Sequence, residues 1–557
     1  MNTNFIKFSL IFLFSIGINT IANSQDVMRK RPAGWENLVY GGRFQDRFLP
    51  LPDHGQLSSD TWGAQQVLPR HVENGIEDNE YSYWGGNIIK DNGKFQMFVC
   101  RWREDEPKGH LAWPKAEVVR AVADNPVGPY RVAQVIGHGH NPELHHLSDG
   151  GYFLYVNNFG AHDYYYSDHI DGPWIKKEFK FDARQRPITD HMANNTFTKR
   201  PDGSMLMVGR GGDIWISKTG ESTYKMVSNG SVYPPYEGKY EDPVVWRTNV
   251  QYHLIVNDWL GRIAYYMRSK DGIKWVLDDG EAYMPGIAKQ SNGKVEDWYK
   301  FERIKVLQDK YGRAYQANFA VCDTIKKQDR GSDNHSSKNI SIPLTVGKLI
   351  TIIGDQKIDD KTKEIKLLIK AENGFNPQTD INIKSLRFGA PQVIDYGGGC
   401  TVTKKERLGN DLLLTFKAKG NGFNTDNFAG KLLGSDKDGK LLYAFCRLPW
   451  VNYKEPYLSA KYPEISLIEN SIKLDIDIEN FGLVTSANAK ILIEYQQDNQ
   501  WKELTRSNLS KLKPFESKRV SMWGKKVEDR GKAIKVRVNI ISQSETIEIL
   551  QGKVVIR

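Results

Sequence analysis

The sequence predicts an all-β protein in which a five-bladed β-propeller is followed by C-terminal β-sandwich domains. Over roughly residues 30–330, a hairpin pattern recurs about every 45 to 60 residues, an interval that suits a four-stranded propeller blade. Between the hairpins, a second pattern recurs in which a strand leads through a polar turn to an aromatic residue. Long helical patterns are almost absent.

Residues 1–24 have the pattern of a secretory signal peptide. Lys7 precedes an apolar run of about a dozen residues, and the segment ends in the small residues Ala22-Asn23-Ser24. We therefore expect a mature chain that begins near Gln25 and is exported to the periplasm or out of the cell. No later stretch approaches the roughly 18 apolar residues that a membrane span requires, so no span is expected.

Five hairpins define the expected blades, each a short strand, a turn containing Asp, Asn or Gly, and a second alternating strand. They are NIIKDNGKFQMFVCRW (87–102), NPELHHLSDGGYFLYVNN (141–158), NTFTKRPDGSMLMVGRG (195–211), EDPVVWRTNVQYHLIVND (241–258) and ERIKVLQDKYGRAYQANFAV (302–321). The aromatic residues of the outer pattern are Tyr130, Trp174, Tyr224 and Trp275. The sequence thus places the propeller, as the catalytic domain, at residues 25–335.

From about residue 338 the pattern changes to long alternating runs rich in Lys and Asn, which favours β-sandwich structure. We assign residues 336–457 to one sandwich and residues 458–557 to a second, adhesion-like one. The spacing leaves open whether these are two modules or one large sandwich.

Charge and cysteine content narrow the classes of ligand that the protein could bind. The formal net charge of +10 is spread along the chain, which argues against nucleic acid and is compatible with an anionic polysaccharide. The four cysteines have no metal-type spacing. Cys100 and Cys322 both end strand-like runs, and two buried thiols are favoured over a disulfide between them.

Polar residues gather where each expected blade begins. The first strand of every blade lines the central channel, so these openings should converge on one pocket. They are Trp84–Asn87, His138–Asn141, Asp190–Asn195, Glu241 with Asp242, and Glu302 with Arg303.

The repeat, the export signal and the run Glu241-Asp242-Pro243 before a strand together resemble the five-bladed propeller glycoside hydrolases of family 43 and the related family 117. The resemblance covers about residues 40–325 and implies that Glu241 is the general acid, with Asp242 as an orienting or tuning carboxylate. The sequence departs from the family where aspartates are expected, with Trp84-Gly85-Gly86-Asn87 in the first blade and Asn141 in the second.

An amide cannot take a proton from water, so the two-carboxylate arrangement is incomplete at those positions. Asp46 is the preferred substitute base, and the acidic run Glu77, Asp78 and Glu80 is another source. For Asp46, a salt bridge to Arg43 or Arg47 is an equally good interpretation.

Histidines offer a second route to catalysis. Eleven of the twelve lie between His54 and His253, and His138, His140 and His191 sit at blade openings. A histidine titrates near neutral pH and can act as acid or base. An oligosaccharide dehydratase or lyase acting on uronic acids, for example from ulvan, is therefore a competing hypothesis. His140 or His191 would be its base.

Other opening residues are expected to bind the sugar. Arg210 and Arg303 would neutralise a developing enolate, and Trp84 would stack on a sugar ring. Amide contacts are expected from Asn87, Asn141 and Asn195. No cofactor is evident; a structural metal ion in the channel is left open, because a third ligand for the His138-x-His140 pair cannot be named. A non-catalytic glycan-binding propeller is the third hypothesis, and the oligomeric state is not predicted.

Overall fold

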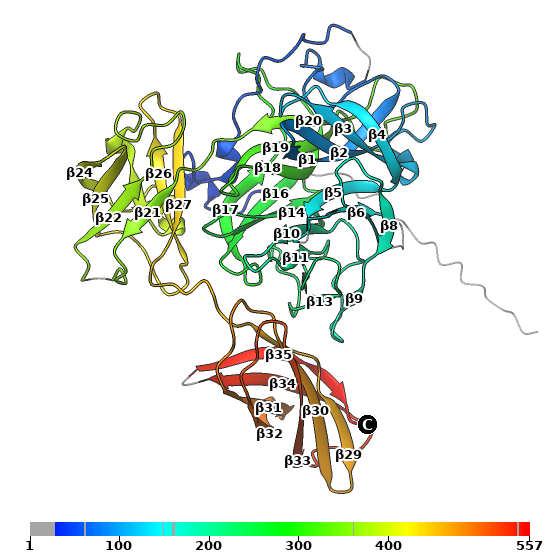
Figure 1. Ribbon diagram of the computed structural model, residues 1–557, viewed down its shortest axis with the longest axis vertical. Coiled ribbons are helices and arrows are strands. Elements are labelled where there is room, and N and C mark those ends of the chain that lie inside the picture. Colours follow the sequence, from blue (N-terminus) through cyan, green and yellow to red (C-terminus); the bar gives the residue numbers. More distant parts are fainter. Residues whose placement is uncertain (1–27, 61–62, 149, 159–161, 360, 543–544) are drawn as a thin grey trace, which may run out of the picture.

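The computed structural model describes residues 28–557 except 61–62, 149, 159–161, 360 and 543–544. The expected signal peptide lies outside the described residues. Figure 1 shows a large N-terminal body, a smaller unit of β21 to β27 beside it and a second small unit of β28 to β35 at the C-terminal end.

Five antiparallel sheets follow one another along the chain, which confirms the predicted five-bladed propeller. The first and second blades contain β1 (Tyr81–Asp91), β2 (Lys94–Arg103), β3 (Glu117–Ala123), β4 (Arg131–His138), β5 (His140–His146), β6 (Tyr152–Asn157), β7 (Asp163–Ser167) and β8 (Ile175–Glu178). The third contains β10 (Thr196–Lys199), β11 (Met205–Val208), β12 (Ile214–Ser217) and β13 (Tyr224–Met226), with β9 (Phe181–Asp182) parallel to β13. The fourth and fifth contain β14 (Tyr240–Arg247), β15 (Tyr252–Asp258), β16 (Ile263–Ser269), β17 (Val276–Tyr283), β18 (Lys300–Gln308), β19 (Ala314–Cys322) and β20 (Ser337–Pro343).

The fifth blade is completed by the segment that precedes the first blade. Ile76 forms an antiparallel bridge with Asn339 of β20, and Asn74 exchanges hydrogen bonds with the backbone of Ser341. This pairing of chain start with last blade closes the ring. The fifth sheet continues to Pro343, whereas the propeller predicted from the sequence ends at residue 335. The difference arises because β20 is buried but polar in composition, so its sequence does not resemble a core strand.

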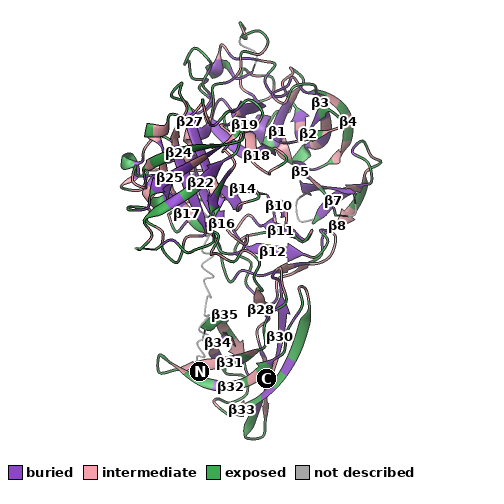
Figure 2. Cartoon of the chain, turned by 60° about the vertical axis from the view of Figure 1, so that its left-hand side comes forward, coloured by how far each residue is buried: buried purple, intermediate pink, exposed green. Residues whose placement is uncertain are grey.

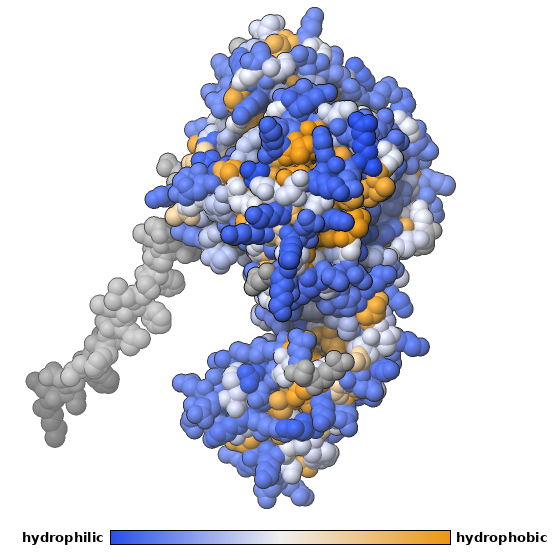
Figure 3. Space-filling model, turned by 90° about the vertical axis from the view of Figure 1, so that its left-hand side faces the viewer, coloured by the Kyte–Doolittle hydropathy of each residue, from blue (hydrophilic) through white to orange (hydrophobic). Residues whose placement is uncertain are grey.

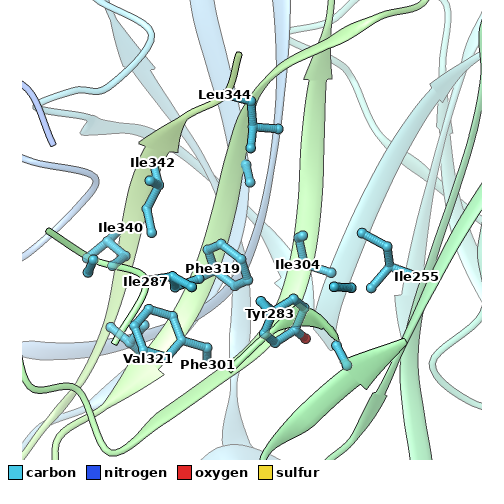
Figure 4. Close-up of a cluster of buried hydrophobic side chains, with 14 of the residues drawn as sticks. Ile255, Tyr283, Ile287, Phe301, Ile304, Phe319, Val321, Ile340, Ile342 and Leu344 are labelled. Carbon is cyan, nitrogen blue, oxygen red and sulfur yellow. The ribbon is translucent and has the colours of Figure 1, made fainter. Parts of the chain in front are cut away.

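Large apolar side chains between the blades hold the ring rigid. Figure 4 shows one such cluster, in which Phe301 of β18 and Phe319 of β19 pack with Tyr283 of β17. The propeller strands are largely buried in Figure 2. Burial of apolar area contributes roughly 25 cal/mol per Å², so this packing fixes the inner strands on which the candidate site is built.

The first C-terminal unit consists of two sheets that share one apolar core, as in a β-sandwich. One sheet contains β21 (Ile350–Ile353), β22 (Glu364–Ile369), β25 (Asp411–Lys417) and β24 (Val402–Leu408). The other contains β23 (Arg387–Gly389), β26 (Ala429–Ser435) and β27 (Leu441–Arg447), with the short helix α1 (Pro391–Ile394) beside it. Leu367 and Leu414 of the first sheet pack with Leu432 and Ala444 of the second.

The second C-terminal unit has the same plan and a separate core. Its sheets contain β28 (Leu458–Ala460), β29 (Glu464–Ile468), β30 (Ser471–Asn480) and β33 (Ser517–Lys525), and β31 (Ala489–Gln497), β32 (Gln500–Leu509), β34 (Ala533–Ser542) and β35 (Glu545–Val555). Because Ile476, Ile493 and Val538 belong to a cluster distinct from that of the first unit, the C-terminal region forms two modules.

Helical structure in the described chain is limited to short pieces. Besides α1, they are the 3-10 turns η1 (Trp35–Asn37), η2 (Phe44–Arg47), η3 (Gln65–Val67), η4 (Gly109–Lys115) and η5 (Ile383–Ser385). Within the described ranges, none of the helices has the length and apolar character needed to cross a bilayer. The face in Figure 3 is mainly hydrophilic, with hydrophobic side chains in small patches.

All four cysteines are described, and all four are buried free thiols. Burial raises the pKa of Cys100 and of Cys322 to about 12, so both remain protonated. The interpretation as buried thiols therefore agrees with the structure.

Candidate active site

The inner strands of the propeller share a local irregularity at the same end of the channel. The pairing register shifts between Trp84 and Asn87 in β1, His140 and Glu143 in β5, Glu241 and Val244 in β14, and Glu302 and Lys305 in β18, each time as a β-bulge. One residue per blade has left-handed backbone geometry, with φ of 69° at Gly85, 53° at Asn141, 51° at Asn194, 58° at Asp242 and 54° at Arg303.

These five positions are structurally equivalent, and only the first is glycine. A non-glycine residue in this region costs about 1–3 kcal/mol and persists where the surrounding structure enforces it. The bulges turn the polar side chains of the blade openings towards a single hollow.

That hollow is a cavity of about 780 Å³ at one end of the channel. Its wall combines the blade openings with η4, the segment before β10, the β11–β12 turn and residues 325–328. Eight of the eleven residues predicted for the site line it: Trp84, His140, Asn141, His191, Arg210, Glu241, Asp242 and Arg303. A volume of this size suits a ligand larger than a monosaccharide.

Among the three carboxylates that line the cavity, Glu241 is the most accessible, with 19% of its side chain exposed. Its Oε2 lies 3.5 Å from Nη2 of Arg210, and its Oε1 lies 3.9 Å from Nη2 of Arg303. The Asn194 amide donates a hydrogen bond to Oε1. Glu241 is thus held by one hydrogen-bond donor and two neighbouring guanidinium groups, and its side chain lines the cavity.

Asp242 differs sharply from its neighbour, because only 2% of its side chain is exposed. Burial raises its pKa to about 7; Glu241 and Glu302 act in the same direction, while Arg303, 2.9 Å away at Nε, opposes them. Near neutral pH Asp242 therefore holds a proton for part of the time.

Asn194 connects these groups. Its amide nitrogen donates to Glu241 and lies 3.4 Å from Oδ1 of Asp242, while its amide oxygen accepts from Asn141 at 3.3 Å and Asn157 at 2.7 Å. Two donors on the oxygen fix the amide so that its NH₂ faces the carboxylates. The sequence predicts the adjacent Asn195 instead. Aligning the blade openings so that Asn194 stands opposite Asp242 would have identified Asn194.

The two predicted histidines occupy different environments. His140 is buried against Trp113, with ring centroids 4.4 Å apart, and its Nε2 accepts from Asn157 at 3.1 Å. Burial, assisted by Arg303, lowers the pKa of His140 to about 3, so the ring is neutral and weakly basic.

His191 lies at the rim of the cavity, with 63% of its side chain exposed. Its Nδ1 is 2.7 Å from Oδ1 of Asp190, and Nη1 of Arg210 donates to its Nε2 at 2.9 Å. Since Nε2 accepts a hydrogen bond, Nδ1 carries the proton that is donated to Asp190. His138, in contrast, contacts the carbonyl of Pro114 at 3.1 Å and does not line the cavity.

The cavity contains a third carboxylate, Glu302. The sequence places this residue at the fifth blade opening, but it is not among the predicted site residues. Glu302 is ion-paired with Lys326 and lies 3.6 Å from Nζ of Lys300. Burial would raise its pKa, but the two lysines outweigh burial and hold the pKa of Glu302 below its ordinary value. Lys326 comes from a loop between blade strands, where its role has no sequence signal.

Aromatic rings form the remaining wall. Trp84, Trp102, Trp113 and Trp259 line the cavity, and Nζ of Lys326 lies 4.7 Å from the centre of the Trp84 ring. Flat rings of this kind stack on the apolar faces of sugars.

Three predicted residues lie elsewhere. Asp46 accepts hydrogen bonds from the backbone amides of Gly41 at 2.8 Å and Arg43 at 3.1 Å, so it caps η2, outside the cavity. The structure therefore contradicts its selection as the base. Asn87 accepts from the Leu144 amide at 2.9 Å, and the Asn195 amide donates to Tyr155 at 3.2 Å; both lie outside the cavity lining.

The acidic run before the first blade is also outside the cavity, where Glu77 pairs with Arg70 and Asp78 accepts from Tyr83. Over the described ranges, no group of three or more His, Cys, Asp or Glu side chains is arranged to hold a metal ion.

Neither a protein-family model nor a curated protein matches the chain. Solved structures with a similar fold include a glycosyl hydrolase from Bacteroides ovatus (12% identity, 53% of this chain and 96% of that chain, TM-score 0.35). Others are the GH43 protein BlXynB from Bacillus licheniformis (8%, 86% and 90%, 0.31) and the Bacteroides ovatus xyloglucan protein GH43B (10%, 85% and 90%, 0.32).

These likenesses concern the fold. The chemistry of the cavity is argued from its own residues.

Proposed function

We propose that this protein is a carbohydrate-active enzyme, a glycoside hydrolase in which Glu241 is the general acid and His191 the general base. One observation carries the proposal: the guanidinium of Arg210 bridges the two groups, 3.5 Å from Glu241 and 2.9 Å from His191, at the edge of a tryptophan-lined cavity. A proton donor and a proton acceptor thus flank the space in which a sugar would lie.

The acid role rests on the Glu241–Asp242 pair. Hydrolysis requires a carboxyl that donates a proton to the glycosidic oxygen, and Glu241 is the more accessible member of the pair, with 19% of its side chain exposed against 2% for Asp242. Asp242 orients Arg303, 2.9 Å away, and does not itself reach the leaving group.

The base role of His191 depends on its orientation. Asp190 accepts from Nδ1, so Nε2 has the free electron pair that takes a proton from water. Arg210 occupies this position in the structure, and a bound anionic group would draw the guanidinium away.

The charge of the cavity favours an anionic oligosaccharide. Its wall includes five cationic side chains, Arg210, Lys300, Arg303, Lys326 and Lys327, against three carboxylates, Glu241, Asp242 and Glu302. With Asp242 partly protonated, the excess of positive charge grows. A uronate or sulfated sugar would offset it.

The same cationic excess supports a second candidate, elimination or dehydration of a uronyl residue. His191 would remove the proton beside the carboxylate, and Arg210 with Arg303 would neutralise the enolate. His140 fits this role less well, because its pKa of about 3 makes it a poor base at neutral pH. Glycan binding without turnover remains the third candidate.

An oligosaccharide panel separates the three candidates. Purified protein is incubated with neutral and uronyl-containing oligosaccharides of equal length, and the products are weighed by mass spectrometry. Hydrolysis adds one water per bond broken, whereas dehydration removes one. A panel that binds without any mass change would leave only glycan binding.

A further inference from the structure

A second hollow, of about 70 Å³, lies where the propeller meets the first sandwich. Its wall includes η2, the turn between β14 and β15, the segment after β20 and β27, so both domains contribute. We refer to it as the junction crevice. It shares no lining residue with the large cavity.

Charge is distributed unevenly in the junction crevice. Its wall includes three cationic side chains, Arg47, Arg313 and Lys348, and no carboxylate. Arg313 is paired with Asp309 at 2.7 Å and Glu372 at 2.6 Å, both behind the wall. The other two cations lack such partners.

Arg47 is the more deeply buried of the two, at 5% exposed. Its guanidinium carbon lies 4.4 Å from the ring centre of Tyr443 and 4.5 Å from that of Phe44. Within the described part of the chain, no carboxylate lies within ion-pair distance of it, and Asp278 acts only from further away. Tyr443 and Tyr266, the latter also as a hydrogen-bond partner, offset the desolvation cost and raise the pKa of the Arg47 guanidinium, but among the described residues its positive charge has no carboxylate partner.

On the side of the junction crevice formed by the first sandwich, Lys348 is likewise a cation packed against an aromatic ring. Its Nζ lies 4.2 Å from the ring centre of Phe375, and among the described residues no carboxylate is in ion-pair distance. Burial lowers the pKa of Lys348, and Arg313 adds to the effect against the attraction of Glu372. A half-buried lysine with a lowered pKa is one whose positive charge is incompletely compensated.

Aromatic and polar groups complete the wall. Trp246 and Tyr311 come from the propeller, and Tyr443 comes from the sandwich. Thr248 and Asn249 supply hydroxyl and amide groups beside them. Flat rings next to cations that lack a carboxylate partner match a saccharide that carries a negative group.

We propose that the junction crevice is a second binding site, which takes the carboxylate or sulfate group of an anionic saccharide between Arg47 and Lys348. A volume of about 70 Å³ admits the charged group and not a whole sugar. The ring would therefore rest at the opening against the aromatic side chains. This inference does not require the large cavity to be catalytic.

Crystals of the full-length protein soaked separately in sodium selenate and in glucuronate locate the site directly. Anomalous selenium signal and glucuronate density beside the Arg47 guanidinium are expected. Selenate without glucuronate would mean that only a small inorganic anion enters, and would overturn the saccharide proposal. Absence of both would overturn the site itself.

Calorimetric titration with glucuronate, and with glucose as the neutral control, tests the same site in solution. Lys348→Met should weaken the junction site for glucuronate by about tenfold or more, because a charge-assisted hydrogen bond is lost. Lys405→Met, an exposed lysine on β24 of the same sandwich, should leave binding unchanged. Arg47→Met should act like Lys348→Met where its melting temperature shows that it folds.

The Arg210→Met variant distinguishes glucuronate binding in the large cavity from glucuronate binding in the junction crevice. It should lose binding in the large cavity and keep binding in the junction crevice. Unchanged glucuronate affinity in Lys348→Met, measured in the Arg210→Met background, would refute the proposal.

Discussion

Asp242 gives the chain a pH-dependent stability that a single substitution should remove. Its pKa rises from 3.8 in a solvated carboxyl to about 7 in the folded protein, chiefly through burial. The folded state therefore binds a proton that the unfolded state has lost between these two pH values. The stabilisation is complete below pH 3.8 and is lost as the pH rises through about 7.

The size of this effect follows from the two pKa values. An increase from 3.8 to about 7 corresponds to about 4 kcal/mol of unfolding free energy over the whole range. The slope is steepest near pH 5 to 6, at about 1 kcal/mol per pH unit, and falls to about half of that at pH 7, where half of the folded molecules have released the proton. In Asp242→Asn this component should disappear.

Urea unfolding at pH 5, 6 and 7, followed by tryptophan fluorescence, measures the difference. Eleven of the fourteen tryptophans lie between Trp35 and Trp298, so the signal reports on the propeller. The stability of the wild type minus that of Asp242→Asn should fall by about 2 kcal/mol from pH 5 to pH 7, with the smaller part of the fall between pH 6 and pH 7. The exposed Asp168→Asn should run parallel to the wild type. If Asp242→Asn also runs parallel, the buried, proton-binding state of Asp242 is refuted.

Three further substitutions test separate parts of the structure. His191→Ala should lower kcat by about 10²- to 10⁴-fold, whereas an unchanged kcat would exclude it as the base. Asn194→Gly, which accepts the left-handed backbone without strain, should lower kcat while the fold is kept, because the carboxylates lose a shared donor; a loss of fold measured by circular dichroism would show a structural role instead. Ile342→Ala, in the core between blades four and five, should cost about 2–5 kcal/mol in urea unfolding, and a cost below about 1 kcal/mol would contradict the packing in that core.

The sequence predicts the propeller well because the same blade pattern occurs several times, and each occurrence supports the same fold. Strand, turn and strand recur at an interval that few other folds explain, and the fourth blade opening identifies Glu241 and Asp242. The cavity brings both residues together with Arg210 and Arg303, although Arg210 lies 31 positions before Glu241 and Arg303 lies 62 positions after it, and no local pattern links them.

The errors have local causes. The sequence points to Asn195 in place of Asn194 because the left-handed backbone at Asn194 cannot be read from residue type, and a shift of one residue exchanges channel-facing and core-facing side chains. Asp46 was selected for its charge, but its neighbours fold into a turn whose backbone amides need an acceptor. Lys326 reaches the cavity from a loop, where residue type alone carries no information about direction.

Hydrolysis in oxygen-18 water most directly tests the central claim that Glu241 protonates a glycosidic bond in the cavity. The wild type should release a product one water heavier, with the label at the new reducing end, and Glu241→Gln should release none while Glu178→Gln, an exposed control on β8, releases it normally. A product one water lighter, or unaltered release by Glu241→Gln, would contradict the account.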